Sequence, residues 1–266
     1  MIVKSFEVKE SGCTARLDVN LLENTSENVK DRVRPMIVIC PGGGYTFCSD
    51  REAEPIAVQF GAMGFHTCIL RYSVAPEARF PVAVRQLAKA VKLVRGSAAE
   101  WKVDPDKIVV LGFSAGGHLA TSLAVFWNRD FLYEGIEAKP EEIRPNGLIS
   151  CYSVISAEYP HTGSYKSLLG DRYGDPEEME RQSLEKQVTK DMPPAFIWHT
   201  VTDQGVPVEN SMVLAAAMKK AGVPFALHLY QEGPHGLALA TMETGFEQAE
   251  AKDWIYKAGE WIRLYI

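Results

Sequence analysis

Short apolar segments alternate with longer amphipathic segments along most of the chain. Six apolar runs have the length of a β-strand, at 36–40, 66–72, 107–111, 147–152, 195–200 and 225–230. Five longer segments repeat their apolar residues at helical spacing, at 52–63, 82–94, 115–127, 207–221 and 246–263. Strands that alternate with helices in this way predict an α/β fold, with a mostly parallel central sheet covered by helices on both faces.

Two regions depart from this alternation. Residues 7–10 and 15–22 resemble antiparallel edge strands, followed by a polar connection over 23–34. Residues 153–194 separate two predicted strands and mix glycine, proline, tyrosine and charged residues. Because a plain crossover is shorter and long loops are usually functional or disordered, we expect a cap or lid inserted at 153–194 within a single domain over 1–266.

Composition and charge exclude several classes of protein. Hydrophobic residues make up 46% and charged residues 23% of the 266 residues, which is ordinary for a globular chain. The net charge of −6 argues against a nucleic-acid or acidic-membrane partner. No uncharged apolar run is long enough to span a membrane, and charged residues interrupt the first ten positions, so no signal peptide is expected.

The five cysteines are odd in number and form no close pair. Neither a disulfide framework nor a zinc site is expected from their spacing, and three of them lie in apolar, strand-like runs. Free cysteines of this kind are typical of a reducing compartment, so we expect a cytoplasmic protein.

The motif with the clearest chemistry is Gly112-Phe-Ser-Ala-Gly116. It fits G-x-S-x-G and lies between a predicted strand and a predicted helix. A serine at such a tight strand–helix turn has its hydroxyl exposed above the sheet, where it can act as a nucleophile. The alternative is a structural Gly-Ser turn, which does not explain why the motif lies directly between a predicted strand and a predicted helix. We therefore expect Ser114 to be the catalytic nucleophile.

A serine nucleophile needs a histidine base, and the chain has six histidines. His235 lies in a loop between the last predicted strand and the last predicted helix, at the carboxyl end of the sheet where ligands of α/β proteins bind. His199, at the end of a predicted strand, is the main competitor. We expect His235 to be the base.

The third member is expected to be an acid that orients the imidazole. Asp203 lies in the loop after the 195–200 strand, and the order Ser114, Asp203, His235 is that of α/β hydrolases. Glu232 is the competitor, but a carboxylate three residues from His235 is expected to face solvent. Asp203 as a mere loop-capping residue is the alternative without chemistry.

A run of three glycines follows the 36–40 strand directly. Glycines leave backbone N–H groups accessible and permit backbone angles closed to other residues. Preorganised N–H groups stabilise the negative charge that develops on an attacked carbonyl oxygen. We expect Gly43, Gly44 and Ala115 to supply these oxyanion donors. A phosphate-binding turn is the alternative, but no Gly-Lys-Ser/Thr follows and Ser114 would then be unexplained.

Five further residues are candidates for the substrate pocket. Ser49-Asp-Arg-Glu52 fits a helix capping box, with Ser49 at the N-cap and Glu52 at the third position, which explains the motif without chemistry. Asp50 and Arg51, within this motif, are candidates for the pocket mouth. Tyr45, His161 and Tyr165 are candidates for stacking on a sugar or hydrogen bonding to it.

With these residues identified, the sequence resembles the esterase/lipase branch of the α/β-hydrolase superfamily, and in particular the bacterial BD-FAE-type, acetylxylan-esterase-like carbohydrate esterases. The resemblance covers residues 36–240 through segments that include Pro41-Gly-Gly-Gly-Tyr45, Gly112 to His118, Asp203 to Ser211 and His235-Gly236. It departs at Pro41, where relatives with His-Gly-Gly-Gly have a histidine, so substrate preference does not transfer from the hormone-sensitive-lipase-like group.

The resemblance implies the same triad and oxyanion loop, and a serine esterase that removes short acyl groups, acetyl above all, from a sugar or oligosaccharide. No metal or organic cofactor is needed for this chemistry. An arylformamidase- or peptidase-like amide hydrolase is the alternative on the same residues, and a catalytically silent binding module is a third. The expected partner is a small ester, with neither nucleic acid nor membrane; pairing of the N-terminal edge strands into a homo-oligomer is a further hypothesis.

Overall fold

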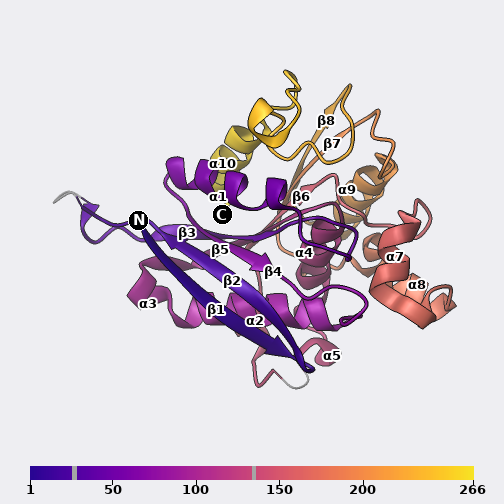
Figure 1. The fold of residues 1–266 in the computed structure, drawn as a ribbon, viewed down its shortest axis with the longest axis horizontal. Coiled ribbons are helices and arrows are strands. Elements are labelled where there is room, and N and C mark those ends of the chain that lie inside the picture. The colour runs from indigo at the N-terminus through magenta and orange to yellow at the C-terminus, as the bar shows by residue number, and fades with distance from the viewer. Residues whose placement is uncertain (26–28, 134–135) are drawn as a thin grey trace.

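The computed structural model describes residues 1–25, 29–133 and 136–266. Within these ranges the strands form one eight-stranded sheet in the order β1-β2-β4-β3-β5-β6-β7-β8 (Figure 1). Their bounds are β1 (Ile2–Glu10), β2 (Cys13–Leu21), β3 (Arg34–Cys40), β4 (His66–Arg71), β5 (Val103–Phe113), β6 (Gly147–Cys151), β7 (Ala195–Thr200) and β8 (Phe225–Tyr230).

The sheet is parallel from β4 to β8, whereas β1 and β2 run antiparallel to their neighbours. The predicted α/β class with a mostly parallel sheet is therefore confirmed. The two N-terminal strands are antiparallel, as expected, but only β1 lies at an edge, because β2 also pairs with β4. Strand β5 begins at Val103 rather than 107, since pairing of Val103 with Arg34 on β3 extends it through polar residues that hide the strand in the sequence.

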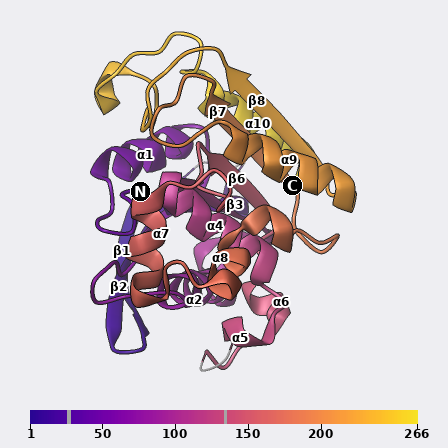
Figure 2. The ribbon, with the colours of Figure 1, turned by 90° about the vertical axis from the view of Figure 1, so that its right-hand side faces the viewer.

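Alternation along the central strands distributes side chains to two faces of the sheet. Val38 and Val110 contribute to one buried cluster together with residues of α2 (Val82–Gly96), α4 (Ser114–Phe126) and α9 (Glu209–Ala221). Their neighbours Ile37 and Leu111 contribute to a second cluster with α1 (Glu54–Ala62) and α10 (Trp254–Tyr265). Because successive strand residues point to opposite faces, an uninterrupted apolar strand needs helices on both sides, which is what Figures 1 and 2 show.

Three predicted helices begin later than expected, among them α9, which starts at Glu209 rather than 207. Helix α10 starts at Trp254. Residues 246–248 instead form a loop, in which the Gln248 N–H donates to the Ala240 carbonyl at 2.9 Å, and residues 249–253 form turns. Helix α1 starts at Glu54, after a short 3-10 turn, η2 (Asp50–Glu52). Short helices that the sequence pattern did not indicate also occur, namely α3 (Ala98–Trp101), α5 (Asp130–Tyr133), α6 (Pro140–Ile143) and η5 (Met242–Thr244).

The long segment between β6 and β7 is largely helical. It contains α7 (Thr162–Leu169), η3 (Gly170–Arg172), α8 (Pro176–Gln182) and η4 (Leu184–Gln187). Helices α7 and α8 lie beside α4 (Figure 2), and His118 on α4 contacts both the Tyr165 ring and the Gln182 carbonyl. Across the described ranges, no helix combines the length and apolar character needed to cross a membrane.

Candidate active site

Ser114 lies at the turn between β5 and α4 in a strained backbone conformation. Its φ of 52° is in the left-handed region, which non-glycine residues rarely adopt and which clusters at functional sites. Gly116 permits the tight turn, because a Cβ there would lie 2.2 Å from the Cys40 carbonyl oxygen and 2.3 Å from that of Pro41. The predicted strand–turn–helix context of Ser114 is therefore present.

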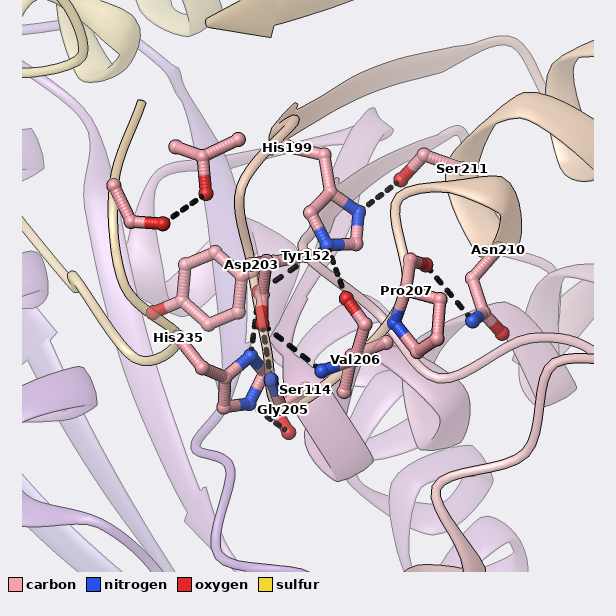
Figure 3. A network of polar contacts seen from close by, with 12 residues as sticks. Ser114, Tyr152, His199, Asp203, Gly205, Val206, Pro207, Asn210, Ser211 and His235 are labelled. Carbon is pink, nitrogen blue, oxygen red and sulfur yellow. Dashed lines mark hydrogen bonds and ion pairs between the residues drawn. The ribbon is translucent and has the colours of Figure 1, made fainter. Parts of the chain in front are cut away.

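Three side chains from separate loops meet at the carboxyl end of the sheet (Figure 3). The His235 Nε2 lies 2.8 Å from the Ser114 Oγ. On the other side of the ring, His235 Nδ1 lies 2.7 Å from the Asp203 Oδ2. The sequence separates the three residues widely, yet the structure places them in one hydrogen-bonded chain in the predicted order.

Asp203 is held as an ionised carboxylate with both oxygens occupied. Its Oδ1 accepts the backbone N–H groups of Gly205 at 2.8 Å and Val206 at 2.9 Å. Burial by itself would raise the pKa of Asp203, but hydrogen bonds from His199, His235 and the Val206 backbone hold it well below the usual range. Such a carboxylate can only accept hydrogen bonds.

The ionised Asp203 decides where the proton of His235 lies. Because Asp203 accepts at Nδ1, the neutral ring carries its hydrogen there and presents a bare Nε2. That nitrogen can accept the Ser114 hydroxyl hydrogen at 2.8 Å. The arrangement can therefore take a proton from Ser114 and stabilise the imidazolium that results.

His199, the competitor for the base, is a second partner of Asp203. It is fully buried, and its Nε2 lies 3.0 Å from the Val206 carbonyl oxygen and 3.3 Å from the Asp203 Oδ2. Its Nδ1 lies 2.8 Å from the Ser211 Oγ (Figure 3). Since both ring nitrogens are engaged away from Ser114, His199 orients Asp203 rather than competing with His235. The other competitor, Glu232, is exposed.

The loop after β3 places free N–H groups beside Ser114. Gly43 and Gly44 line the pocket with Ser114, and Ala115 follows it at the start of α4. Within the described residues, the N–H groups of these three donate to no protein acceptor. Gly43 has a φ of 125°, and a Cβ there would lie 2.1 Å from the Phe47 carbonyl oxygen, so only glycine fits.

The pocket above Ser114 has a volume of about 340 Å³. Of the five substrate-binding candidates, Arg51 and His161 line it, together with Phe47, an exposed aromatic that the sequence pattern did not single out. Asp50 lies outside, where its carboxylate pairs with Arg71 at 2.7 Å. The residues that line the pocket are Gly43, Gly44, Thr46, Phe47, Ser49, Arg51, Glu52, Ser114, His161, His235 and Gly236.

The two tyrosine candidates point into the interior instead of the pocket. Tyr45 is 4% and Tyr165 1% exposed. The Tyr45 hydroxyl donates to His118 Nδ1 at 2.9 Å, and His118 Nε2 donates to the Gln182 carbonyl at 3.2 Å. Tyr165 donates to the same carbonyl at 3.3 Å. Both hydroxyls are used inside the protein: that of Tyr45 joins the glycine loop to His118 on α4, and that of Tyr165 joins α7 to α8.

The buried His118 is expected to make the fold less stable at acidic pH. Burial lowers its pKa to about 4, from an ordinary value of 6.5. As pH falls, the unfolded chain therefore protonates this side chain first, and the free energy of unfolding should fall between pH 6.5 and 4 by about 3 kcal/mol through His118. Chemical denaturation at a series of pH values should show a shallower decline in His118→Gln than in wild type. Parallel pH profiles would contradict this expectation.

The capping-box interpretation of Ser49 and Glu52 is wrong. Ser49 makes no side-chain cap hydrogen bond, and the Glu52 side chain is buried, with 3% exposed. Its oxygens accept the Gly42 N–H and the Tyr152 hydroxyl instead. Two buried donors far from each other in sequence outcompete the local helix end, which a sequence motif cannot reveal.

Comparison with solved structures identifies close structural relatives. The acetyl ester-xyloside bifunctional hydrolase of Caldicellulosiruptor lactoaceticus is 33% identical, with a TM-score of 0.84 over 98% of this chain and 95% of that one. The carboxylesterase Cest-2923 of Lactobacillus plantarum is 28% identical, also with a TM-score of 0.84, over 99% and 97% of the two chains. The fold is thus that of an α/β hydrolase.

Comparison of sequences gives consistent results. The BD-FAE family model matches residues 17–218. Endo-1,4-beta-xylanase B of Butyrivibrio fibrisolvens is 37% identical over 80% of this chain and 34% of its own length. An acetylxylan esterase of Xylanibacter ruminicola is 31% identical over 77% of this chain and 41% of its own length. The matched regions thus span less than half the length of these two curated relatives.

Proposed function

Because the chain belongs to the BD-FAE family, we propose that it is a serine esterase that hydrolyses short-chain carboxylic esters, with acetyl groups on a sugar or oligosaccharide as the substrate class. The observation that carries the proposal is the hydrogen-bonded chain from Ser114 Oγ to His235 at 2.8 Å and from His235 to Asp203 at 2.7 Å.

In the proposed reaction, the Ser114 oxygen attacks the ester carbonyl carbon while its proton passes to His235 Nε2. Asp203 holds the ring in the required tautomer and stabilises the imidazolium. The tetrahedral intermediate collapses, the alcohol leaves with the proton from His235, and an acyl-enzyme remains. Water then gives a proton to His235 while its oxygen bonds to the acyl carbon. The bond from that carbon to the Ser114 oxygen breaks, His235 returns its proton to this oxygen, and the carboxylic acid leaves.

The oxyanion of both tetrahedral intermediates is assigned to the N–H groups of Gly43, Gly44 and Ala115. Their freedom from protein acceptors within the described residues supports this assignment. Losing one such donor typically costs about 3–4 kcal/mol of the barrier. The donors are backbone groups, so Pro41 in place of the histidine of related motifs leaves them intact; its carbonyl is held by the Tyr72 hydroxyl at 2.8 Å.

Two observations support the substrate class. The pocket volume of about 340 Å³ is at the small end for ligand sites, which suits a short acyl group. One structural relative is named an acetyl ester-xyloside bifunctional hydrolase, and one sequence relative is named an acetylxylan esterase. Arg51, His161 and Phe47 line the pocket and are proposed to contact the alcohol half of the substrate, with residues 153–194 as a cap.

We also propose a cytoplasmic location, on the ground that the five cysteines are free thiols.

A panel of p-nitrophenyl esters tests the proposal. The value of kcat/KM should be highest for the acetate ester and about tenfold or more lower for the octanoate ester, because a pocket this small has no room for the added methylene groups. Acetylated xylose should release acetate in the same preparation. A preference for octanoate would contradict the short-chain assignment. Cleavage of acetanilides in preference to acetate esters would point to amide hydrolysis on the same triad.

A further inference from the structure

Glu52 is a buried carboxylate directly beside the candidate oxyanion loop, Pro41–Tyr45. Its Oε2 accepts the Gly42 N–H at 2.8 Å, and its Oε1 accepts the Tyr152 hydroxyl at 2.7 Å. Burial raises the pKa of Glu52, while these two donors and the nearby His235 charge oppose the rise. Each partner supplies a hydrogen, so the carboxylate needs none of its own. Burying this carboxylate without these hydrogen bonds would cost much of the free energy of folding.

Tyr152 links this carboxylate to the loop that holds His235. Its hydroxyl donates to Glu52 and accepts the Ala238 N–H at 2.9 Å. Its ring lies edge-on to the His235 imidazole, with centroids 5.2 Å apart. Tyr152 has a φ of 37° and Ala238 a φ of 51°, both in the strained left-handed region. The backbone is therefore strained at both residues that this link joins, Tyr152 and Ala238.

Gly42 is the residue of the oxyanion loop that these contacts anchor. The Gly42 N–H is taken by Glu52, and the Gly42 carbonyl accepts the Ser49 N–H at 2.9 Å. With both backbone groups of Gly42 engaged, the orientation of the next peptide units is set, while Gly43 and Gly44 keep N–H groups that donate to no acceptor within the described residues. The loop is thus preorganised rather than shaped by substrate.

We propose that Glu52 and Tyr152 act as a positioning pair that locks the oxyanion loop and the His235 loop together in the geometry that the transition state requires. The inference rests on the proposed esterase function, because it assigns the pair to that same site. Neither residue touches the reacting atoms; the pair acts through Gly42, Ala238 and the His235 ring. Loss of the link should raise the barrier and leave the fold and substrate binding largely intact.

The test compares steady-state kinetics on p-nitrophenyl acetate for Glu52→Ala, Glu52→Gln and Tyr152→Phe. We expect kcat to fall about 100-fold in Glu52→Ala and Tyr152→Phe, the size of losing one oxyanion donor, with KM changed by less than about threefold. Glu52→Gln keeps an oxygen for the Gly42 N–H and should recover at least about tenfold of the kcat lost in Glu52→Ala.

Matched controls remove equivalent groups elsewhere. Glu10→Gln removes a 7% exposed carboxylate on β1 that pairs with Lys89, and Tyr230→Phe removes a tyrosine hydroxyl on β8 that bonds Asp253. Both should keep wild-type kcat. If Glu52→Ala fails to fold, the kcat of Tyr152→Phe decides the question. Wild-type kcat in Tyr152→Phe, or no recovery in Glu52→Gln, would overturn the proposal.

A second readout separates this inference from the proposed function. A fluorophosphonate probe reacts with the activated Ser114 hydroxyl whether or not the natural substrate is an ester. If wild type labels at Ser114 but cleaves no ester, the proposed function fails, and slower labelling of Glu52→Ala and Tyr152→Phe than of wild type still supports the pair. Equal labelling rates in wild type and both variants would overturn it.

Discussion

Replacing Ser114 by alanine should lower kcat on p-nitrophenyl acetate by roughly 10⁴- to 10⁶-fold, as observed when serine hydrolases lose their nucleophile. Without the Oγ that lies 2.8 Å from His235 Nε2, no acyl-enzyme can form. Residual turnover would come from the oxyanion donors and from binding alone. The fold should be unaffected, because alanine at this φ of 52° is no more strained than serine. Steady-state kinetics and thermal unfolding measure the two effects.

Ser122→Ala is the matched control for this variant. Ser122 lies on the same helix, α4, and is also buried, but its hydroxyl bonds the His118 carbonyl at 2.8 Å. We expect Ser122→Ala to keep wild-type turnover and to take up the fluorophosphonate probe, whereas Ser114→Ala should take up none. Turnover by Ser114→Ala near that of wild type would mean that the serine mechanism is wrong.

The second large effect is expected from Asp203→Asn, which should lower kcat about 10⁴-fold, the loss known for this change in a chymotrypsin-type triad. Asparagine can keep its oxygen toward the N–H groups of Gly205 and Val206, at 2.8 and 2.9 Å. Its NH₂ group would then face His235, and the ring would have to carry its hydrogen on Nε2. Ser114 would lose its proton acceptor while the site kept its shape, so KM should change little.

Glu232→Gln provides the control for the acid. Glu232 is exposed and close to His235 in sequence, and it is the other carboxylate that the sequence offers as the orienting acid. Its variant should keep wild-type kcat and pH dependence. Loss of turnover in Glu232→Gln together with normal turnover in Asp203→Asn would reverse the assignment.

Most of the architecture could be predicted from local pattern. Strands β7 and β8 have the predicted bounds, because each is a short apolar run between clear turn residues. Element ends were less predictable where tertiary pairing overrides composition, as at Val103, which pairs with Arg34 across the sheet. The late start of α10 has a similar cause, since the Gln248 N–H, within the expected first turns, donates to the distant Ala240 carbonyl instead.

The candidate triad was predictable because each member stands next to a recognisable element: a strand–helix elbow, or a loop after a strand. The supporting residues were not. Glu52 matches a helix cap in sequence, and its partners, Gly42 and Tyr152, are distant in the chain. His199 was considered only as a rival base, and its contact with Asp203 depends on how the loop after β7 folds back. Tyr45 and Tyr165 show the converse, since their residue type suits a sugar site but their hydroxyls are used inside the protein.

By itself, the sequence determined the α/β class, the order of elements and the three residues proposed for catalysis, because hydrophobic period and short motifs are local properties. Only the tertiary structure decided which buried donors and acceptors pair: that Glu52 holds Gly42 and Tyr152, and that His199 supports Asp203. Such pairings follow from where loops meet above the sheet. That placement depends on packing of the whole chain, which no short stretch of sequence records.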